Sequence, residues 1–224
     1  TARQRQLLRE GRFDYLQGQI LPSETGWQYM LEAATYYTPP QHPDDHVLLD
    51  GLGHGSQEVQ DLTYWDFANR LDRGVTYLQE TGEWWHPHPW ANLFLPGTAT
   101  DDFLEHILTD LTPADLGAPG LLLVYPIHTQ PLTTPLLSTP RTEVIFLIAA
   151  LRYTPPDDPL SLERLIATNR DWYDKAKALG GTAYPIGTIP FTQHDWQTHH
   201  ATSLTGTRRR YDPRSILGRS LVCG

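Results

Sequence analysis

The sequence predicts an α+β fold, in which a largely antiparallel sheet carries helices packed on one face. Residues 13–21 alternate apolar and polar side chains, as a half-buried strand does. Residues 144–151 form a continuous apolar run, which is typical of a strand covered on both faces. Residues 158–179 carry apolar side chains at helical spacing. The order of these elements favours helices on one side of the sheet. The opposite face is left for a ligand or a second domain.

Composition and charge exclude several classes of protein. A chain of 224 residues suits one domain or one and a half. Its net charge of −9 argues against a nucleic-acid partner, because phosphate binding needs clustered Lys and Arg. The longest apolar run, 144–151, is far shorter than the roughly 18 residues of a membrane span, so no membrane partner is expected. The single cysteine, Cys223, cannot form an internal disulfide, which predicts a cytoplasmic location.

The first quarter of the chain is expected to form a short helix and three strands. The helix covers residues 2–10 and a glycine ends it. The strand over 13–21 is followed by a short turn, so the next strand, 27–37, should pair with it antiparallel. A third strand is predicted over 46–52. The two faces of the first strand carry Leu16, Gly18 and Ile20 on one side and Tyr15, Gln17 and Gln19 on the other.

Two helices and a strand are expected in the middle of the chain. Residues 63–71 have apolar side chains at helical spacing behind a cap-like Thr63. Residues 101–111 repeat this pattern, with Thr100 as the expected cap. A strand over 120–126 follows the second helix.

The last third contains the longest predicted helix and a tail. Residues 129–140 hold several prolines and threonines and should form a loop. The helix over 158–179 opens with Pro159 at its first turn and ends at a Gly-Gly pair. Residues 183–190 are expected to be extended, and a further helix is expected over 193–204.

Residues 84–96 combine three tryptophans, two histidines and three prolines, with a strand predicted over 90–95. This segment resembles the His-Pro-Trp-Leu-Asn segment of cytokinin dehydrogenases and of bacterial FAD-linked oxidoreductases that share their C-terminal half. They belong to the vanillyl-alcohol oxidase/PCMH-type flavoprotein superfamily. The segments that match in the same order are Phe13 to Gly18, Glu32 to Ala34, Tyr36-Tyr37, His88 to Phe94, Leu123 to Pro126, Val144 to Leu151, Asn169-Arg170 and Arg210 to Pro213.

The resemblance implies the substrate-binding half of an FAD-dependent oxidoreductase. Residues 1–190 would form the substrate-binding domain, and 191–224 would return to the FAD domain, as in relatives. FAD would be held mainly by residues that are not in this chain, so the expected partners are an FAD-binding domain or partner chain and a small-molecule substrate. The expected reaction is oxidation of a C–N or C–OH group by hydride transfer to flavin. The catalytic residues stay unidentified.

The resemblance also implies site residues. Substrate contacts are expected from Gln17, Asn92, Tyr125 and Tyr184, and cofactor contacts from Trp90 and Tyr211. Gln17 stands where the plant enzymes carry a Glu, and the amide has no charge to offer, which argues for a ligand other than cytokinin. For Gln17 and Tyr125, plain packing at the strand surface stays an alternative to a pocket role.

Other chemistry finds little support in the sequence. The glycines of 51–56 lack the spacing of a dinucleotide-binding loop. His86 and His88 would share one face of a strand, but a zinc site needs further ligands, so no metal is expected. No serine lies in a nucleophile elbow.

A second reading stays open at the level of function. A free-standing domain of this fold could bind a small molecule or carry out non-redox chemistry, because fold does not fix function. In relatives a strand of the same domain precedes the segment at 2–10. We therefore expect an open sheet edge, and a longer protein or a partner chain that completes it.

Overall fold

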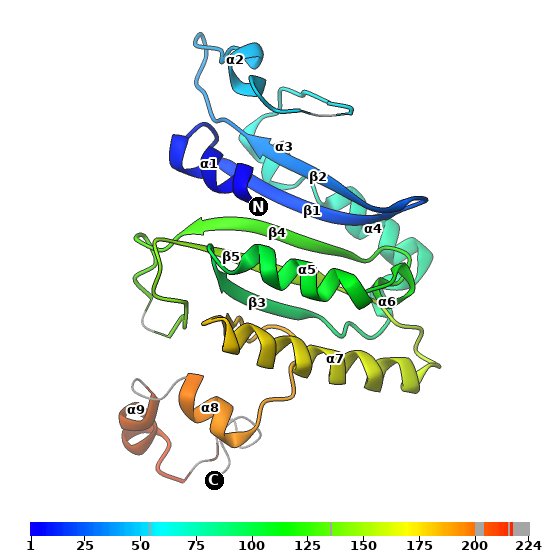
Figure 1. The fold of residues 1–224 in the computed structure, drawn as a ribbon, viewed down its shortest axis with the longest axis vertical. Coiled ribbons are helices and arrows are strands. Elements are labelled where there is room, and N and C mark those ends of the chain that lie inside the picture. The colour runs from blue at the N-terminus through cyan, green and yellow to red at the C-terminus, as the bar shows by residue number, and fades with distance from the viewer. Residues whose placement is uncertain (54, 135, 200–203, 215, 217–224) are drawn as a thin grey trace.

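The fold is built on one antiparallel sheet. The computed structural model describes residues 1–53, 55–134, 136–199, 204–214 and 216. Within these residues the strands pair in the order β2-β1-β4-β5-β3-β6, every neighbouring pair antiparallel (Figure 1). The strands are β1 (Tyr15–Ser23), β2 (Gly26–Ala34), β3 (Ala91–Pro96), β4 (Leu121–His128), β5 (Val144–Leu151) and β6 (Thr182–Ala183). The α+β class and the antiparallel sheet are confirmed.

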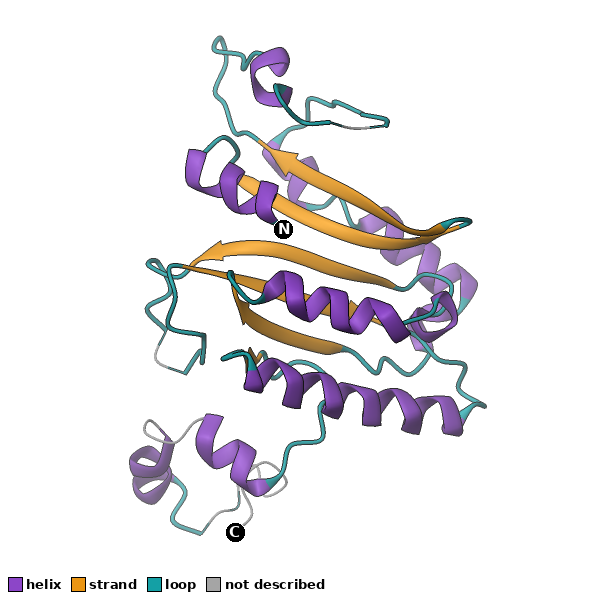
Figure 2. Cartoon of the chain, in the orientation of Figure 1, coloured by secondary structure: helices purple, strands orange, loops and turns teal. Residues whose placement is uncertain are grey.

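Helices lie on both sides of this sheet, as Figure 2 shows. The helices are α1 (Ala2–Glu10), α2 (Asp45–Leu49), α3 (Tyr64–Ala68), α4 (Asp72–Thr81), the 3₁₀ turn η1 (Glu83–Trp85), α5 (Thr100–Asp110), α6 (Pro113–Leu116), α7 (Pro159–Ala178), α8 (Gln193–His199) and α9 (Leu204–Tyr211). The side covered by α1, α5 and α7 is called the helical face below. The other side, behind which α3 and α4 lie, is called the opposite face. The predicted one-sided arrangement therefore describes α1, α5 and α7 but not α3 and α4.

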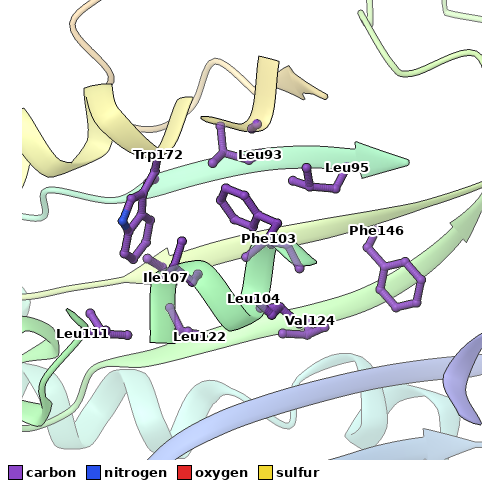
Figure 3. Close-up of a cluster of buried hydrophobic side chains, with 14 of the residues drawn as sticks. Leu93, Leu95, Phe103, Leu104, Ile107, Leu111, Leu122, Val124, Phe146 and Trp172 are labelled. Atoms are coloured by element: carbon purple, nitrogen blue, oxygen red, sulfur yellow. The ribbon is translucent and has the colours of Figure 1, made fainter. Parts of the chain in front are cut away.

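The main hydrophobic core fills the helical face, between the sheet and helices α5 and α7 (Figure 3). Phe103 and Ile107 of α5 and Trp172 of α7 meet side chains from the central strands. Burying one such side chain contributes about 1.5–3 kcal/mol relative to leaving it in water. The alternation predicted for β1 is confirmed, because Leu16, Gly18 and Ile20 are buried and the residues between them are partly exposed.

Helix α7 follows the sequence prediction closely. The Asp158 carboxylate accepts a hydrogen bond from the Ser161 backbone N–H at 3.0 Å, and Pro159 occupies the first turn. Gly180 has φ +79°, a left-handed conformation that side chains other than glycine rarely adopt, and it ends the helix. Strand β5 is buried along its whole middle, as the apolar run predicted.

The strand predicted over 46–52 is wrong, because Asp45–Leu49 form the short helix α2. The side chain of Asp44 accepts a hydrogen bond from the His46 backbone N–H at 2.9 Å, which starts the helix. No residue of α2 is buried, and Val47 is 66% exposed. The strand prediction assumed that the apolar residues of this segment pack against other elements. They do not, because no residue of α2 is buried.

Two further boundaries differ from the prediction. The helix expected over 63–71 ends at Ala68, although Thr63 caps it as predicted by accepting the Asp66 N–H at 3.1 Å. Helix α4 follows and was not predicted. Thr100 is not the cap of α5 but lies inside its first turn, and its hydroxyl donates to the Pro96 carbonyl oxygen at 3.0 Å.

The tail keeps contact with the sheet through its backbone. The Tyr184 and Thr188 N–H groups donate to the carbonyl oxygens of Asn92 and Trp90 at 2.9 and 2.7 Å. The segment thus meets β3 at these two points, but the extended conformation predicted for 183–190 is interrupted by a turn at 185–187. The predicted helix over 193–204 corresponds to α8, Gln193–His199; residues 200–203 of the predicted span lie outside the described residues, as does Cys223. Among the described helices, none combines the length and apolar character that crossing a bilayer requires.

Candidate functional site on the opposite face of the sheet

The strand register brings most of the predicted site residues onto the opposite face. Tyr125 of β4 pairs with Leu147 of β5, which pairs with Phe94 of β3. In the next row, Asn92 of β3 pairs with Ala149 of β5. Side chains that face each other across antiparallel strands share one face. Asn92 and Tyr125 therefore lie on the same side of the sheet.

Gln17 and Tyr184 join this face from its two ends. Gly18 pairs with Val124, so one further step along this register sets Gln17 beside Tyr125. On the other side of the sheet, the Tyr184 N–H bonds the Asn92 carbonyl, which puts Tyr184 in the row of Asn92. The four predicted substrate residues are thus spread across the sheet on one face, although they come from four separate parts of the sequence.

Trp90 and Asn92 carry buried N–H donors that find no acceptor among the described residues. Asn92 is 2% exposed, and neither its Nδ2 nor the Nε1 of Trp90 has a hydrogen-bond partner in the part of the chain that the structure describes. Continuing the β3–β5 register sets Trp90 opposite Leu151, on the same face as Asn92. A buried donor left unpaired costs about 1–3 kcal/mol. Such donors are therefore suited to a ligand that supplies the acceptor.

The segment 183–190 approaches β3 closely beside these two donors. A side chain at Gly187 would place its Cβ 2.6 Å from the Trp90 carbonyl oxygen and 3.1 Å from Asn92 Nδ2. Only glycine therefore lets the 183–190 segment approach β3 this closely. The side chain of Asn169 on α7 also donates to the Trp90 and Thr188 carbonyl oxygens, at 3.3 and 2.8 Å, which fixes both segments.

Tyr125 and Tyr184 border a smaller apolar cluster on this face. The buried members of the cluster are Phe94, Ile145, Leu147 and Ala149. Tyr184 meets Phe94 with ring centroids 5.4 Å apart. Burial, with a smaller contribution from Tyr184, raises the pKa of Tyr125. The Tyr125 phenol therefore stays protonated at neutral pH and can donate its O–H.

The loop predicted over 129–140 lies against this same cluster. Leu132 and Leu137 pack against its apolar residues. The Thr182 hydroxyl donates to the Ser138 carbonyl oxygen at 2.7 Å and ties the loop to β6. The chain's own residues therefore cover the part of the opposite face around Phe94 and Leu147.

Tyr211 is not brought to the other predicted site residues. It lies at the end of α9 and is 68% exposed, with the Arg210 guanidinium 5.2 Å from its ring centroid. Figure 1 shows α9 beside α8, apart from the sheet. The expected contact between Tyr211 and a cofactor would need a partner surface outside the opposite face.

A polar network on this face was missed by sequence reasoning. The Arg70 Nε donates to Glu32 Oε1 at 2.8 Å, and its Nη2 donates to the Tyr15 hydroxyl at 2.7 Å. Tyr15 in turn donates to Gln17 Oε1 at 2.8 Å. The alternation of β1 had put Tyr15 beside Gln17, but nothing local indicates the partner that arrives 55 residues later.

The two histidines of the central segment do not converge on a common point. His86 Nδ1 lies 2.8 Å from Glu83 Oε2, whereas the His88 ring packs edge-on against Trp90 and Tyr153. Burial lowers the pKa of His88. Within the described ranges, no group of three or more His, Cys, Asp or Glu side chains could hold a metal ion.

Comparison with known proteins agrees with the resemblance read from the sequence. Residues 4–221 match the family model described as cytokinin dehydrogenase 1, FAD and cytokinin binding. The chain is 39% identical over 211 residues to an uncharacterized oxidoreductase, ORF5 in the fasciation locus of Rhodococcoides fascians, covering 92% of this chain and 47% of that protein. It is 26% identical over 209 residues to cytokinin dehydrogenase 2 of Arabidopsis thaliana, covering 88% of this chain and 41% of the relative.

These coverages mean that the chain spans less than half the length of these relatives. Cytokinin dehydrogenase 4 of Arabidopsis thaliana matches at 31% identity over 131 residues, which are 55% of this chain. The family model, by contrast, extends over nearly the whole chain. The chain belongs to the cytokinin dehydrogenase family, to the domain described as FAD and cytokinin binding.

Proposed function

We propose that this chain is the substrate-binding part of an FAD-dependent oxidoreductase that oxidises a small C–N or C–OH substrate. The observation that carries the proposal is that Gln17, Trp90, Asn92, Tyr125 and Tyr184 all lie on one face of the sheet. Membership of the family supports it, because the family model includes FAD binding. FAD would be bound mainly by residues outside this chain, contributed by an FAD-binding domain or partner chain.

The residues on the opposite face fit a flavin and an oxidisable substrate. A flavin ring carries carbonyl oxygens and ring nitrogens that accept hydrogen bonds, and the buried Trp90 Nε1 lacks an acceptor among the residues that the structure describes. When bound, FAD would supply the acceptor for the hydride that leaves the carbon next to the amine or alcohol. The chemistry is the cofactor's, so this chain contributes binding and orientation.

The chain's own residues have separate roles in this proposal. Asn92 Nδ2 would hold an acceptor atom of the substrate. The Tyr125 phenol, protonated at neutral pH, would donate a second hydrogen bond. Tyr184, Phe94 and the loop residue Leu132 would exclude water from the reacting carbon. The substrate's N–H or O–H proton would leave to a base outside this chain.

The test uses the full-length gene product that contains this chain. We expect a yellow protein with a flavin absorbance band at about 450 nm. A substrate amine or alcohol should bleach this band under anaerobic conditions. N92A and Y125F should lower kcat/KM by about tenfold or more, because each removes a hydrogen bond in a desolvated site. T109A is the control, since Thr109 is exposed on α5 and its hydroxyl, among the described residues, donates only to the Glu105 carbonyl oxygen of the same helix.

Two results would overturn the proposal. A full-length protein that is colourless and does not take up FAD would favour a free-standing domain that binds a small molecule without redox chemistry. A yellow protein whose kcat/KM responds to N92A and Y125F no more than to T109A would place the substrate away from the opposite face.

A further inference from the structure

A hydrogen-bonded chain of four side chains ends at Gln17. It begins at Glu32 of β2, which accepts from Arg70 Nε at 2.8 Å. Arg70, in the turn after α3, donates through Nη2 to the Tyr15 hydroxyl at 2.7 Å, and Tyr15 donates to Gln17 Oε1 at 2.8 Å. The Arg70 guanidinium also lies over the Tyr15 ring, 4.9 Å from its centroid. Each member is therefore held by its neighbours.

The direction of donation along this chain follows from chemistry. A guanidinium only donates hydrogen bonds, so the Tyr15 oxygen must accept from Arg70. Tyr15 then has one proton to give, and Gln17 Oε1 at 2.8 Å is nearer than Glu32 Oε2 at 3.4 Å. Burial and the Glu32 carboxylate raise the pKa of Tyr15 to about 12, so this proton is present throughout the physiological range.

These hydrogen bonds determine where the NH₂ group of the Gln17 amide points. Its carbonyl oxygen is occupied by Tyr15, and its Nε2 has no acceptor among the residues that the structure describes. The amide therefore presents N–H groups to the opposite face beside Tyr125. On β3 and just before it, three strands from β1 in the sheet, Trp90 Nε1 and Asn92 Nδ2 are donors without a partner among the described residues. The Oε1 atom of Glu32 accepts from Arg70, and its Oε2 atom lies 3.4 Å from the Tyr15 hydroxyl.

We propose that Tyr15, Arg70 and Glu32 are positioning residues that fix the Gln17 amide with its N–H groups toward the substrate. Gln17 then determines specificity by selecting substrates that present an oxygen acceptor, a carbonyl or a carboxylate, at this position. Substrates that present an N–H donor there are rejected, because two donors cannot pair. This inference rests on the proposed function and adds to it the class of group that the substrate carries.

The first test compares ligands of opposite polarity on the yellow full-length protein. The probes are acetophenone, benzoate and benzylamine, and binding is followed by perturbation of the flavin absorbance. The wild type should bind acetophenone and benzoate about tenfold more tightly than benzylamine. Q17E should reverse this order. Y15F, which changes no charge, should reduce the preference for acetophenone over benzylamine several-fold, because the amide is then free to rotate.

The matched control is Q19E. Gln19 lies on the same face of β1, opposite Met30 on one side and Leu123 on the other, and has no bond to Tyr15. The Q19E substitution adds the same negative charge as Q17E, two positions further along the strand. If Q19E reverses the order as far as Q17E does, or if Y15F leaves the order unchanged, the proposal is wrong. If the protein is yellow and a substrate bleaches it, but the ligand affinities do not follow the expected order, the proposed function stands and only this inference is wrong.

The second test needs no flavin. In full-length protein labelled with ¹³C and ¹⁵N in glutamine, the Q17L variant identifies the Gln17 side-chain signals. Y15F should shift the Gln17 carbonyl carbon signal and leave the exchange rate of its NH₂ protons unchanged. The contrary pattern, an unchanged carbonyl and faster NH₂ exchange, would mean that Nε2 faces Tyr15 and would refute the inference.

Discussion

At the scale of single residues, Arg152 stands out because it is buried completely and has no carboxylate partner in the described ranges. It is the largest of the fully buried side chains among the described residues. One of its nitrogens donates to Asn169 Oδ1, and its guanidinium lies 4.6 Å from the Trp172 ring centroid. Its Nε and Nη1 have no partner within the described part of the chain. Burial lowers the pKa of Arg152 to about 10, which shows that the site disfavours the charge.

We expect R152M to be at least as stable as the wild type in urea unfolding. The methionine fills similar space without a buried charge, and such replacements are often neutral or stabilising by about 1–4 kcal/mol. The pKa of Arg152 is lowered in the folded state. The destabilisation caused by burying the charged guanidinium is therefore complete below about pH 10 and declines only above it. The difference between variant and wild type should therefore be constant from pH 6 to 9. R152A should be less stable than R152M, since it leaves a void. A loss of more than about 2 kcal/mol in R152M would contradict this.

Gly18 is constrained by space rather than by its backbone angles. A Cβ there would lie 2.6 Å from the Tyr29 hydroxyl, 2.7 Å from the Val124 carbonyl oxygen and 2.9 Å from Gln4 Nε2. Gln4 donates to that carbonyl at 2.7 Å, which holds α1 on β4. G18A should therefore destabilise the protein by about 1–3 kcal/mol in urea unfolding.

Gly74 provides the matched control for this prediction. It lies inside α4, where a Cβ would meet nothing within 4 Å. G74A should raise the stability by about 0.5–1 kcal/mol, because alanine favours the helix. Equal effects of G18A and G74A would mean that the contact of α1 with β1 and β4 is not tight.

The same scale shows what a sequence can predict about a site. Period-two alternation is local, so the faces of β1 were predicted correctly, with Gln17 and Tyr15 turned away from the core. The contact of Arg70 with Tyr15 depends on where the chain returns after 55 residues, and no local pattern encodes that. For the same reason, the sequence could not show that Trp90 Nε1 and Asn92 Nδ2 find no acceptor in the described part of the chain.

At the scale of elements, predictions succeeded where the apolar residues of a segment face the core. Helix α7 buries Leu165, Trp172 and Ala176 at helical spacing, and its predicted span is confirmed. Helices α2 and α4 bury no residue, so the pattern that identifies a helix by its buried face is weak there. Helix α4 is stabilised locally, and the αL glycine Gly82 ends it.

Helix α8 is attached to α7 through one carboxylate. Asp195 is 2% exposed and accepts from Arg170 Nη1 at 2.5 Å and Lys177 Nζ at 3.2 Å, both on α7. It also accepts from the backbone N–H of Thr192 at 2.9 Å, at the start of α8. These donors together hold the pKa of Asp195 far below its usual value, against the opposing effect of burial.

We expect D195N to destabilise the protein by roughly 3 kcal/mol at pH 7, because it leaves two cations facing a neutral amide. The lowered pKa gives the sign of the pH dependence. The stabilisation is present above the ordinary pKa near about 4 and is lost as pH falls below it. Urea unfolding at pH 7 and pH 3 should show the gap between variant and wild type shrinking. D174N is the control, since Asp174 bonds Arg170 from an exposed position. A gap independent of pH would contradict the prediction.

At the scale of the whole molecule, the two sides of the sheet differ in how they are covered. The helical face is closed by α5 and α7 over the main core. The opposite face has only a loop and the α3–α4 region. Several large apolar side chains stay exposed in that region and in η1, which follows it, with Trp65 and Trp85 each 75% exposed. Exposed apolar side chains are typical of an interaction surface where they form a contiguous patch. This difference between the two faces supports the proposal that a cofactor-binding domain contacts the opposite face.

Hydrogen exchange on the full-length protein should show which face meets the cofactor. Adding FAD to the apoprotein should slow exchange in the loop over 129–140 and in residues 88–92, because both lie on or beside the opposite face. Residues 111–120 on the α5 side serve as the internal control and should not change. Slower exchange in α9 would support the predicted cofactor contact of Tyr211. If protection appears only around 111–120, the cofactor lies on the helical side, and the assignment of Trp90 and Asn92 to its site is wrong.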